Sequence, residues 1–344
     1  MPQRSISPLS LSLAVVFCLG LRISRTLAVE PELYRMLFSI QLVTVLGLWV
    51  ITLWQTKTTM GAILKRADAF WYISAMILAT QLISAAMNGI PLQYNYRFAV
   101  SLTLPLLYPL FRCWSEKDIQ VGAGLALPAF LILSYGVENS NVIAFSTVGL
   151  IILSCRENIR LAFALLLAAM PYLVLKLTCR GALLGLFGAF LGSCSRIRIG
   201  IMLGAAALTA AVGLYLDSEY PSLTHFRDQM ARQAFGLYQT SPLWGVGPGH
   251  TFSTYLNNGW VIQSHSHNLV MTIAAETGSL GLAVLAGLLI TIARKWKSFP
   301  VWSRMLIGAF LIWSFFDEPL QWWMVNNLFW IALSRADAPA DDAR

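Results

Sequence analysis

The chain has 344 residues and a formal net charge of +8, and 57% of its residues are apolar while only 12% are charged. Its mean hydropathy is +0.65, whereas soluble domains are about 45–50% apolar and about 25% charged. The composition excludes an ordinary soluble domain, because one core cannot bury so many apolar runs of ~20 residues. The basic residues lie in clusters between these runs, so we expect no nucleic-acid partner.

The apolar runs predict an all-α, polytopic integral membrane protein with about twelve transmembrane helices. Their expected centres are Val16, Val45, Ala79, Leu106, Phe130, Val148, Leu166, Phe187, Ala207, Ala283, Leu311 and Leu328. With both termini in the cytoplasm, sixteen of the 24 Lys and Arg residues face the cytoplasm, which agrees with the positive-inside tendency. The five scattered cysteines are interpreted as small apolar residues.

The chain is therefore divided into four parts. Residues 1–216 hold transmembrane helices 1–9, residues 217–266 form one large periplasmic loop, and residues 267–334 hold helices 10–12. Residues 335–344 are a short polar cytoplasmic tail, expected to be disordered. The loop begins with an apolar stripe that predicts an amphipathic helix lying on the membrane surface. The residues of this stripe are Leu223, Phe226, Met230, Ala234 and Leu237.

All four histidines lie in this loop or at its exit: His225, His250, His265 and His267. Their confinement to one segment indicates a functional site. His265 and His267 together offer two metal ligands, but no Cys or carboxylate follows at a spacing that completes a zinc site. The sequence therefore favours acid–base chemistry without a metal, since a neutral imidazole accepts a proton near working pH.

His267 is expected at the outer mouth of the tenth span. Gly278 lies eleven positions later, close to three helical turns, and Gly281 follows three positions after it. We therefore expect one helix face to hold the imidazole above a groove of small residues, filled by a neighbouring helix or a lipid tail. Glu276 is expected on the opposite side, as a buried hydrogen-bonding group.

Two arginines are expected at the outer interface. Arg180 stands at the start of the eighth span, and Arg227 lies in the predicted amphipathic helix. A guanidinium pairs two oxygens of a diphosphate and stays protonated, although snorkelling or contact with lipid headgroups is the alternative. Lys176 either adds charge to the same site or snorkels. Arg232 has Asp228 four positions before it, which predicts a surface ion pair.

Glycines follow Arg180, and a glycine-rich run follows the predicted amphipathic helix. Gly181, Gly185, Gly188 and Gly192 recur at helical spacing and predict close packing against a neighbouring helix. The run 245–249 (Gly-Val-Gly-Pro-Gly) has no preceding strand, and Pro248 lacks an amide donor. We interpret it as a turn that folds the loop back over the membrane.

Together these residues resemble the O-antigen ligase and O-antigen polymerase superfamily of bacterial envelope glycosyltransferases. The resemblance covers Arg180-Gly181-Ala182, then Arg227, then residues 242–249, then His267-Asn268-x9-Gly278-x2-Gly281. It implies that His267 is the catalytic base and that Arg180 and Arg227 bind the substrate diphosphate. Auxiliary roles remain open for His265, Asn268 and Lys176, and Gly278 and Gly281 would pack a helix face.

The resemblance also implies the reaction. The donor is a glycan on undecaprenyl diphosphate in the bacterial inner membrane, and the enzyme is an inverting glycosyltransferase without metal or other cofactor, with its active site facing the periplasm. The acceptor is lipid A–core for a ligase of lipopolysaccharide biosynthesis, or a growing glycan for an O-antigen or exopolysaccharide polymerase. A secondary transporter is the alternative from another class, although such proteins place polar residues on broken helices at the bilayer midplane.

Overall fold

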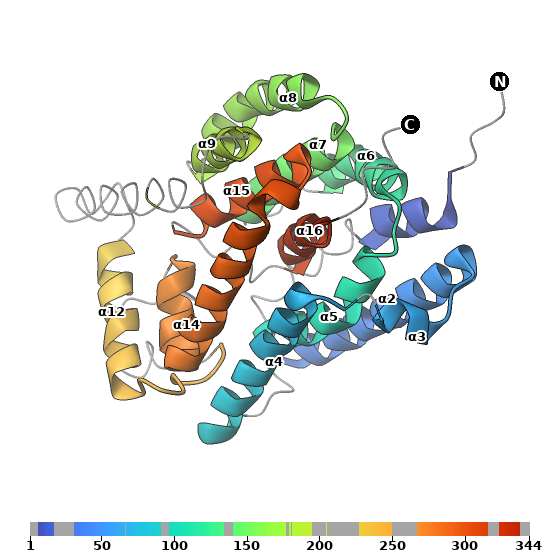
Figure 1. Cartoon of the computed structure of the whole chain (residues 1–344). Coiled ribbons are helices and arrows are strands. Elements are labelled where there is room, and N and C mark those ends of the chain that lie inside the picture. Colours follow the sequence, from blue (N-terminus) through green and yellow to red (C-terminus); the bar gives the residue numbers. More distant parts are fainter. Residues whose placement is uncertain are drawn as a thin grey trace, which may run out of the picture.

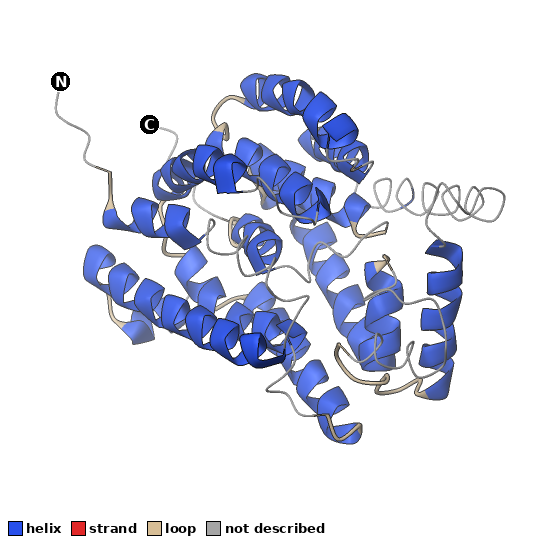
Figure 2. Ribbon diagram, turned by 180° about the vertical axis from the view of Figure 1, so that it is seen from behind, coloured by secondary structure: helices blue, strands red, loops and turns tan. Residues whose placement is uncertain are grey.

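The computed structural model describes residues 6–16, 31–65, 67–90, 96–133, 140–176, 179, 181–194, 204, 227–249, 267–315 and 323–337. Within these residues every regular element is a helix (Figures 1 and 2). Residues 8–16 are helical. The other helices are α2 (Pro31–Thr56), α3 (Met60–Leu64), α4 (Ala69–Met87), α5 (Tyr96–Phe111), α6 (Glu116–Leu133), α7 (Ser140–Ser154), α8 (Ile159–Pro171), a π-helical segment (Tyr172–Lys176), α9 (Gly181–Ser193), α12 (Arg227–Thr240), α14 (Leu269–Lys295), a 3₁₀ turn (Trp296–Ser298), α15 (Val301–Trp313) and α16 (Trp323–Leu333).

The all-α prediction is confirmed for the described residues, but twelve spans are not. Among the residues that the structure describes, three segments are long and apolar enough to cross a membrane: Ser39–Thr56, Ala69–Met87 and Leu269–Ser298. Most other apolar runs form shorter helices. α15, for example, has 13 residues and is therefore about 20 Å long, against ~30 Å of bilayer hydrocarbon. The predicted ninth span, centred on Ala207, lies outside the described residues.

α15 is the central helix of the bundle. Every residue from Trp302 to Trp313 is buried, and α15 contacts α7, α9 and α16. A helix that is apolar on all sides is stable only when other helices surround it. Phe145 of α7 packs on both Phe310 and Trp313 of α15.

α9 packs on α15 through its glycines, as their spacing predicts. A Cβ atom on Gly188 would lie 2.3 Å from the carbonyl oxygen of Gly308, and one on Gly192 would lie 2.2 Å from that of Arg304. Gly181 and Gly185 lie against the indole of Trp313 in the same way. The absent side chains therefore let the two backbones meet, and this contact fixes the start of α9 at the end of α15.

We expect Gly188→Ala to lower the thermal stability of the protein in detergent, because the added methyl group cannot fit against the α15 backbone. Overpacking of this kind costs about 1–3 kcal/mol. The matched control is Gly287→Ala in α14, where no atom lies within 4 Å of the added Cβ atom. The control should be neutral or stabilising, since alanine favours a helix over glycine. Equal melting temperatures for the two variants would contradict the tight α9–α15 contact.

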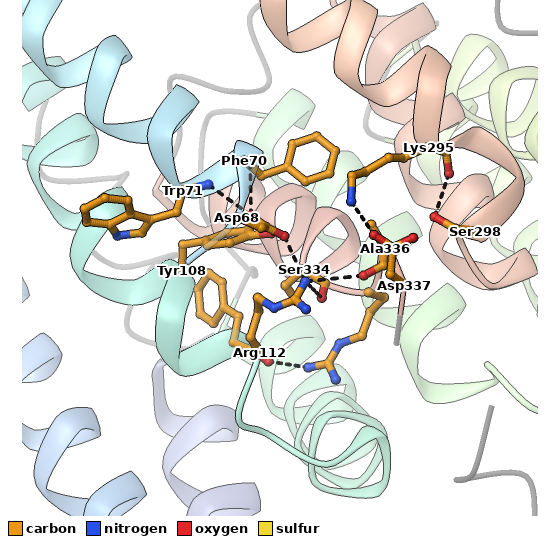
Figure 3. Close-up of polar contacts among 12 residues, drawn as sticks. Asp68, Phe70, Trp71, Tyr108, Arg112, Lys295, Ser298, Ser334, Ala336 and Asp337 are labelled. Atoms are coloured by element: carbon orange, nitrogen blue, oxygen red, sulfur yellow. Dashed lines mark hydrogen bonds and ion pairs between the residues drawn. The ribbon is translucent and has the colours of Figure 1, made fainter. Parts of the chain in front are cut away.

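A polar network closes the end of the bundle where α4 and α14 meet the last described residues (Figure 3). Asp68 caps α4 by accepting from the amides of Phe70 and Trp71, and Arg112 pairs with its carboxylate at 2.9 Å. Arg112 also donates to the carbonyl oxygens of Ser334 and Ala336. These bonds attach the segment after α16 to α4 and α5.

The first residues of the predicted tail are ordered, so the expectation of a disordered tail is wrong for residues 335–337. The guanidinium of Arg335 donates to the carbonyl oxygens of Trp114 and Phe111, at the negative end of the α5 helix dipole. Burial lowers the pKa of Arg335 to about 10, so the group stays protonated at neutral pH. Asp337 pairs with Lys295. The sequence did not predict these contacts, because the partners of Arg335 and Asp337 are distant in the chain.

Candidate functional site

α14 is two helical arms, residues 269–277 and 279–295, that meet at Gly278 (Figure 1). Gly278 has φ 64° and ψ −155°, a backbone conformation that side chains rarely tolerate. A Cβ atom there would lie 2.5 Å from the carbonyl oxygen of Leu243. Glycine is therefore required at this position for two independent reasons, the backbone angle and the close approach of the loop after α12.

We call the residues that bond across this break the junction: 242–247 and 275–280. The amides of Val246 and Gly247 donate to the carbonyl oxygens of Ala275 and Glu276. In the other direction, the amides of Ser279 and Leu280 donate to the carbonyl oxygens of residues 242 and 243. Backbone groups freed by a helix break are tolerated in an apolar environment only when another segment pairs them, and the loop does so here.

The glycine run 245–249 is the turn that its composition predicts. Gly245, Gly247 and Gly249 have φ of 71°, 105° and 71°. Gly245 also lies so close to the backbone of Glu276 that a Cβ atom would be 2.3 Å from its carbonyl carbon. The turn therefore holds α12 against α14.

The predicted single helix face from His267 to Gly281 is wrong. α14 begins at Leu269, and its helical phase is interrupted at Gly278. The groove expected beside Gly278 is filled by the loop after α12, and Gly281 packs against Thr277 of its own helix. Periodicity failed here because it assumes one continuous helix, which the glycine that completes the pattern interrupts.

The apolar stripe of α12 faces protein. Met230, Ala234 and Leu237 are buried, and Ala234 and Leu237 cluster with Ala275 of α14. The prediction of an amphipathic helix is confirmed for these residues, but its apolar face is covered by α14 rather than by a membrane surface. Leu223 and Phe226, which belong to the same predicted stripe, lie outside the described residues.

α12 and the first arm of α14 run side by side in the same direction (Figure 1). The Tyr238 hydroxyl, near the end of α12, lies 3.0 Å from that of Ser279, which follows the break at the end of the first arm. The first residues of both helices consequently lie at the other end of the pair. Arg227 is the first residue of α12 and Leu269 the first of α14, although the arginine side chain lies outside the described atoms.

His267 lies two residues before α14 in a left-handed conformation, with φ 54°. Non-glycine residues adopt this conformation at a cost of about 1–3 kcal/mol when the surrounding structure imposes it, often at functional sites. The next residue, Asn268, caps α14 by accepting from the amide of Met271. The local backbone therefore places His267 at the entrance of the helix.

The end of α15 anchors this entrance. The Asn268 carboxamide donates to the carbonyl oxygen of Phe315 at 3.0 Å, and the amide of Leu269 donates to that of Ser314 at 2.9 Å. Gly181, the residue after Arg180, lies on Trp313 at the same end of α15. Thus the sequence neighbours of Arg180 and of His267 share one anchor.

Some predicted site residues fall outside what the structure describes. Arg180, His265, His225 and His250 lie outside the described residues. Lys176 is the last residue of the π-helical segment, and its side chain is not among the described atoms.

A cavity of about 130 Å³ lies between the two arms of α14 and helices α4, α5 and α16. Its polar lining includes Thr272 and Glu276 of the first arm and Gln81 of α4. Its apolar lining includes Val284 and Leu288 of the second arm. Glu276 is only 4% exposed, which confirms the prediction of a buried carboxyl group.

Sequence reasoning missed two polar residues of α4. The Ser84 hydroxyl donates to the carbonyl oxygen of Glu276 at 2.7 Å, and the Asn88 carboxamide donates to that of Gly245 at 3.0 Å. Both therefore contact the junction. The available signal was a serine and an asparagine at the end of an apolar run. They are four positions apart, so they lie on the same face of a helix.

Comparisons of the chain with protein-family models, with curated proteins and with solved structures find no match.

Proposed function

We propose that this protein is an inverting membrane glycosyltransferase that moves a glycan from undecaprenyl diphosphate to an acceptor hydroxyl, most simply as an O-antigen ligase acting on lipid A–core. The observation that supports it most is the left-handed His267, held between the Asn268 cap and the end of α15. A residue fixed in this way at a helix entrance suits a base that must meet a reacting hydroxyl.

In the proposed reaction, His267 accepts the proton of the acceptor hydroxyl while the hydroxyl oxygen attacks the anomeric carbon. The bond from that carbon to the diphosphate oxygen breaks, and undecaprenyl diphosphate leaves as an anion. Arg180 and Arg227 bind this anion through paired hydrogen bonds. Attack opposite the leaving group inverts the anomeric configuration, and a diphosphate leaving group requires no general acid.

The positions of the neighbouring residues support a shared site. Gly181 and Asn268 both contact the end of α15. α12 starts, with Arg227, at the end of the α12–α14 pair where α14 also starts. A diphosphate donor would be bound best if both guanidiniums reached the space beside His267, because each can pair two of its oxygens. The cavity between the arms of α14 adds an apolar space suited to part of an isoprenoid chain.

Reconstitution in liposomes tests the proposal. The purified protein should consume a glycan linked to undecaprenyl diphosphate and form a product on lipid A–core, detected by gel and mass spectrometry. Longer carrier-linked glycans in place of this product would favour the polymerase of the same superfamily. No consumption of the donor with any acceptor would contradict transferase activity.

The reaction should not depend on a metal ion. We expect full transfer activity in the presence of EDTA, because arginines rather than a divalent cation neutralise the diphosphate. The measurement compares initial rates with and without the chelator, using EDTA saturated with Mg²⁺ as the control. Loss of activity that zinc restores would contradict this mechanism.

One observation favours a secondary transporter, the second candidate. α14 is broken beside the buried Glu276, and transporters bind ions or substrates at such breaks. At this break, however, the carbonyl oxygen of Glu276 already accepts from Gly247 and Ser84, so it is occupied rather than directed at an ion. Solute uptake by the same liposomes, without donor consumption, would support transport instead.

A further inference from the structure

We propose that Ser84 of α4 and Asn88, the residue at the C-cap of that helix, are positioning residues for the transfer reaction: they fix the junction, and the junction sets the spacing between Arg227 and His267. This inference rests on the proposed function for its catalytic consequence. Its structural half, the control of the spacing, does not depend on the reaction and is measured separately.

The contacts of the two residues are directed at the junction from a third helix. Ser84 is 1% exposed, and its hydroxyl gives the carbonyl oxygen of Glu276 a second donor in addition to the amide of Gly247. The Asn88 carboxamide donates to the carbonyl oxygens of Gly245 and, at 2.8 Å, of Ser84. Asn88 thus holds the loop after α12, and Ser84 holds the first arm of α14.

The geometry of α12 amplifies any movement at the junction. α12 has 14 residues, so Arg227 lies about 21 Å along the helix from its attached end. A rotation of α12 by about 10° at the junction therefore moves Arg227 by about 4 Å. Because a misplacement of about 1 Å can cost a hundredfold in rate, the reaction requires a rigid junction.

The apolar contacts of α12 do not remove this requirement. Ala234, Leu237 and Ala275 form a small cluster with Val246 and Met271 packed against it, and such apolar contacts are non-directional, so they do not by themselves fix the angle between two helices. Directional bonds from α4 supply the missing constraint, since hydrogen bonds weaken steeply when their angle changes.

The experiment uses the full chain with Ser84→Ala, Asn88→Ala and the double variant. Ser74→Ala is the matched control, because Ser74 is also a buried serine of α4 but its hydroxyl bonds within the helix, to Trp71. Ser84→Thr restores the hydroxyl and serves as the rescue variant.

The first readout is the distance between spin labels at Gln229→Cys and Val270→Cys, near the starts of α12 and α14, in a background without the native cysteines. We expect the double variant to shift or broaden this distance by about 3 Å, since position 229 lies about 17 Å along α12 from its attached end. Ser74→Ala and Ser84→Thr should reproduce the parent distribution. An unchanged distribution in the double variant overturns the proposal.

The second readout is the kinetics of glycan transfer. We expect kcat to fall about 10–100-fold in the double variant, with little change in the KM for the lipid-linked donor. A loss confined to KM, or an altered distance with unchanged kcat, overturns the positioning role. If the parent protein transfers no glycan, the proposed function fails, while the distance measurement still decides whether α4 sets the spacing. Should the double variant fold poorly, the spin-label distance and kcat are compared between Ser84→Ala and Ser84→Thr, and a difference between these two variants tests the proposal in the same way.

Discussion

Replacement of His267 by alanine should reduce glycan transfer by about 10²–10⁴-fold, the usual contribution of a general base. The Asn268 cap and the backbone bond from Leu269 to Ser314 do not involve the imidazole, so insertion and folding should persist. The measurement is the initial rate of product formation in liposomes, normalised to folded protein. The parent rate should also fall at acidic pH, where the imidazole is protonated and cannot accept a proton.

His250→Ala is the control, since His250 belongs to the same segment but not to the His-Asn motif. It should retain parent activity. In His267→Ala the residual rate should no longer fall at acidic pH. Parent-like activity of His267→Ala would eliminate this residue as the base.

Arg227→Lys should lower kcat/KM for the lipid-linked donor by about 10–100-fold. Lysine keeps the positive charge but loses the planar fork that binds two diphosphate oxygens, and removing one charge-stabilising donor typically costs about a hundredfold or more. Arg227 is the first residue of α12, where lysine does not disturb the helix. Kinetics with the purified donor are therefore a direct measurement of diphosphate recognition.

Arg232→Lys is the matched control on the same helix. Its partner in the sequence is Asp228, and surface ion pairs of this type contribute little. It should leave the kinetics unchanged. Equal kinetics for Arg227→Lys and the parent protein would indicate that Arg227 contacts lipid headgroups instead of the donor.

The sequence predicts where helices form far better than how they end. Every expected span centre within the described residues, from Val16 to Leu328, lies in a helix. The count of twelve spans is not confirmed for the described residues, because apolar composition measures hydrophobicity, not helix length. Short helices such as α15 are stable because other helices surround them, and composition does not distinguish that environment from lipid.

Glycine spacing predicts a close contact between helices, because that contact depends only on steric fit. The glycines of α9 predict close contact, and the structure places α15 against them. By contrast, the stripe of α12 predicts an apolar face without specifying what covers it. The covering residues, among them Ala275, are about 40 positions away in the sequence, and helical periodicity contains no information at that range.

The sequence names candidate site residues, but it does not predict how they are arranged. His267, Asn268 and Gly278 were identified from one motif, yet the motif implied a straight helix. The break follows from backbone bonds between residues 242–247 and 275–280, which no side-chain pattern encodes. Ser84 and Asn88 contact the same junction, and their spacing on one helix face does not indicate that partner.

The order of the two partners along the chain has a consequence for biosynthesis. Residues 242–247 leave the ribosome before residues 275–280. The backbone groups that the break in α14 leaves unpaired within the helix are therefore made after the loop that pairs them. A deletion of 242–247 should therefore expose α14 to quality-control proteolysis during membrane insertion, whereas loss of a later helix such as α16 would leave this pairing intact.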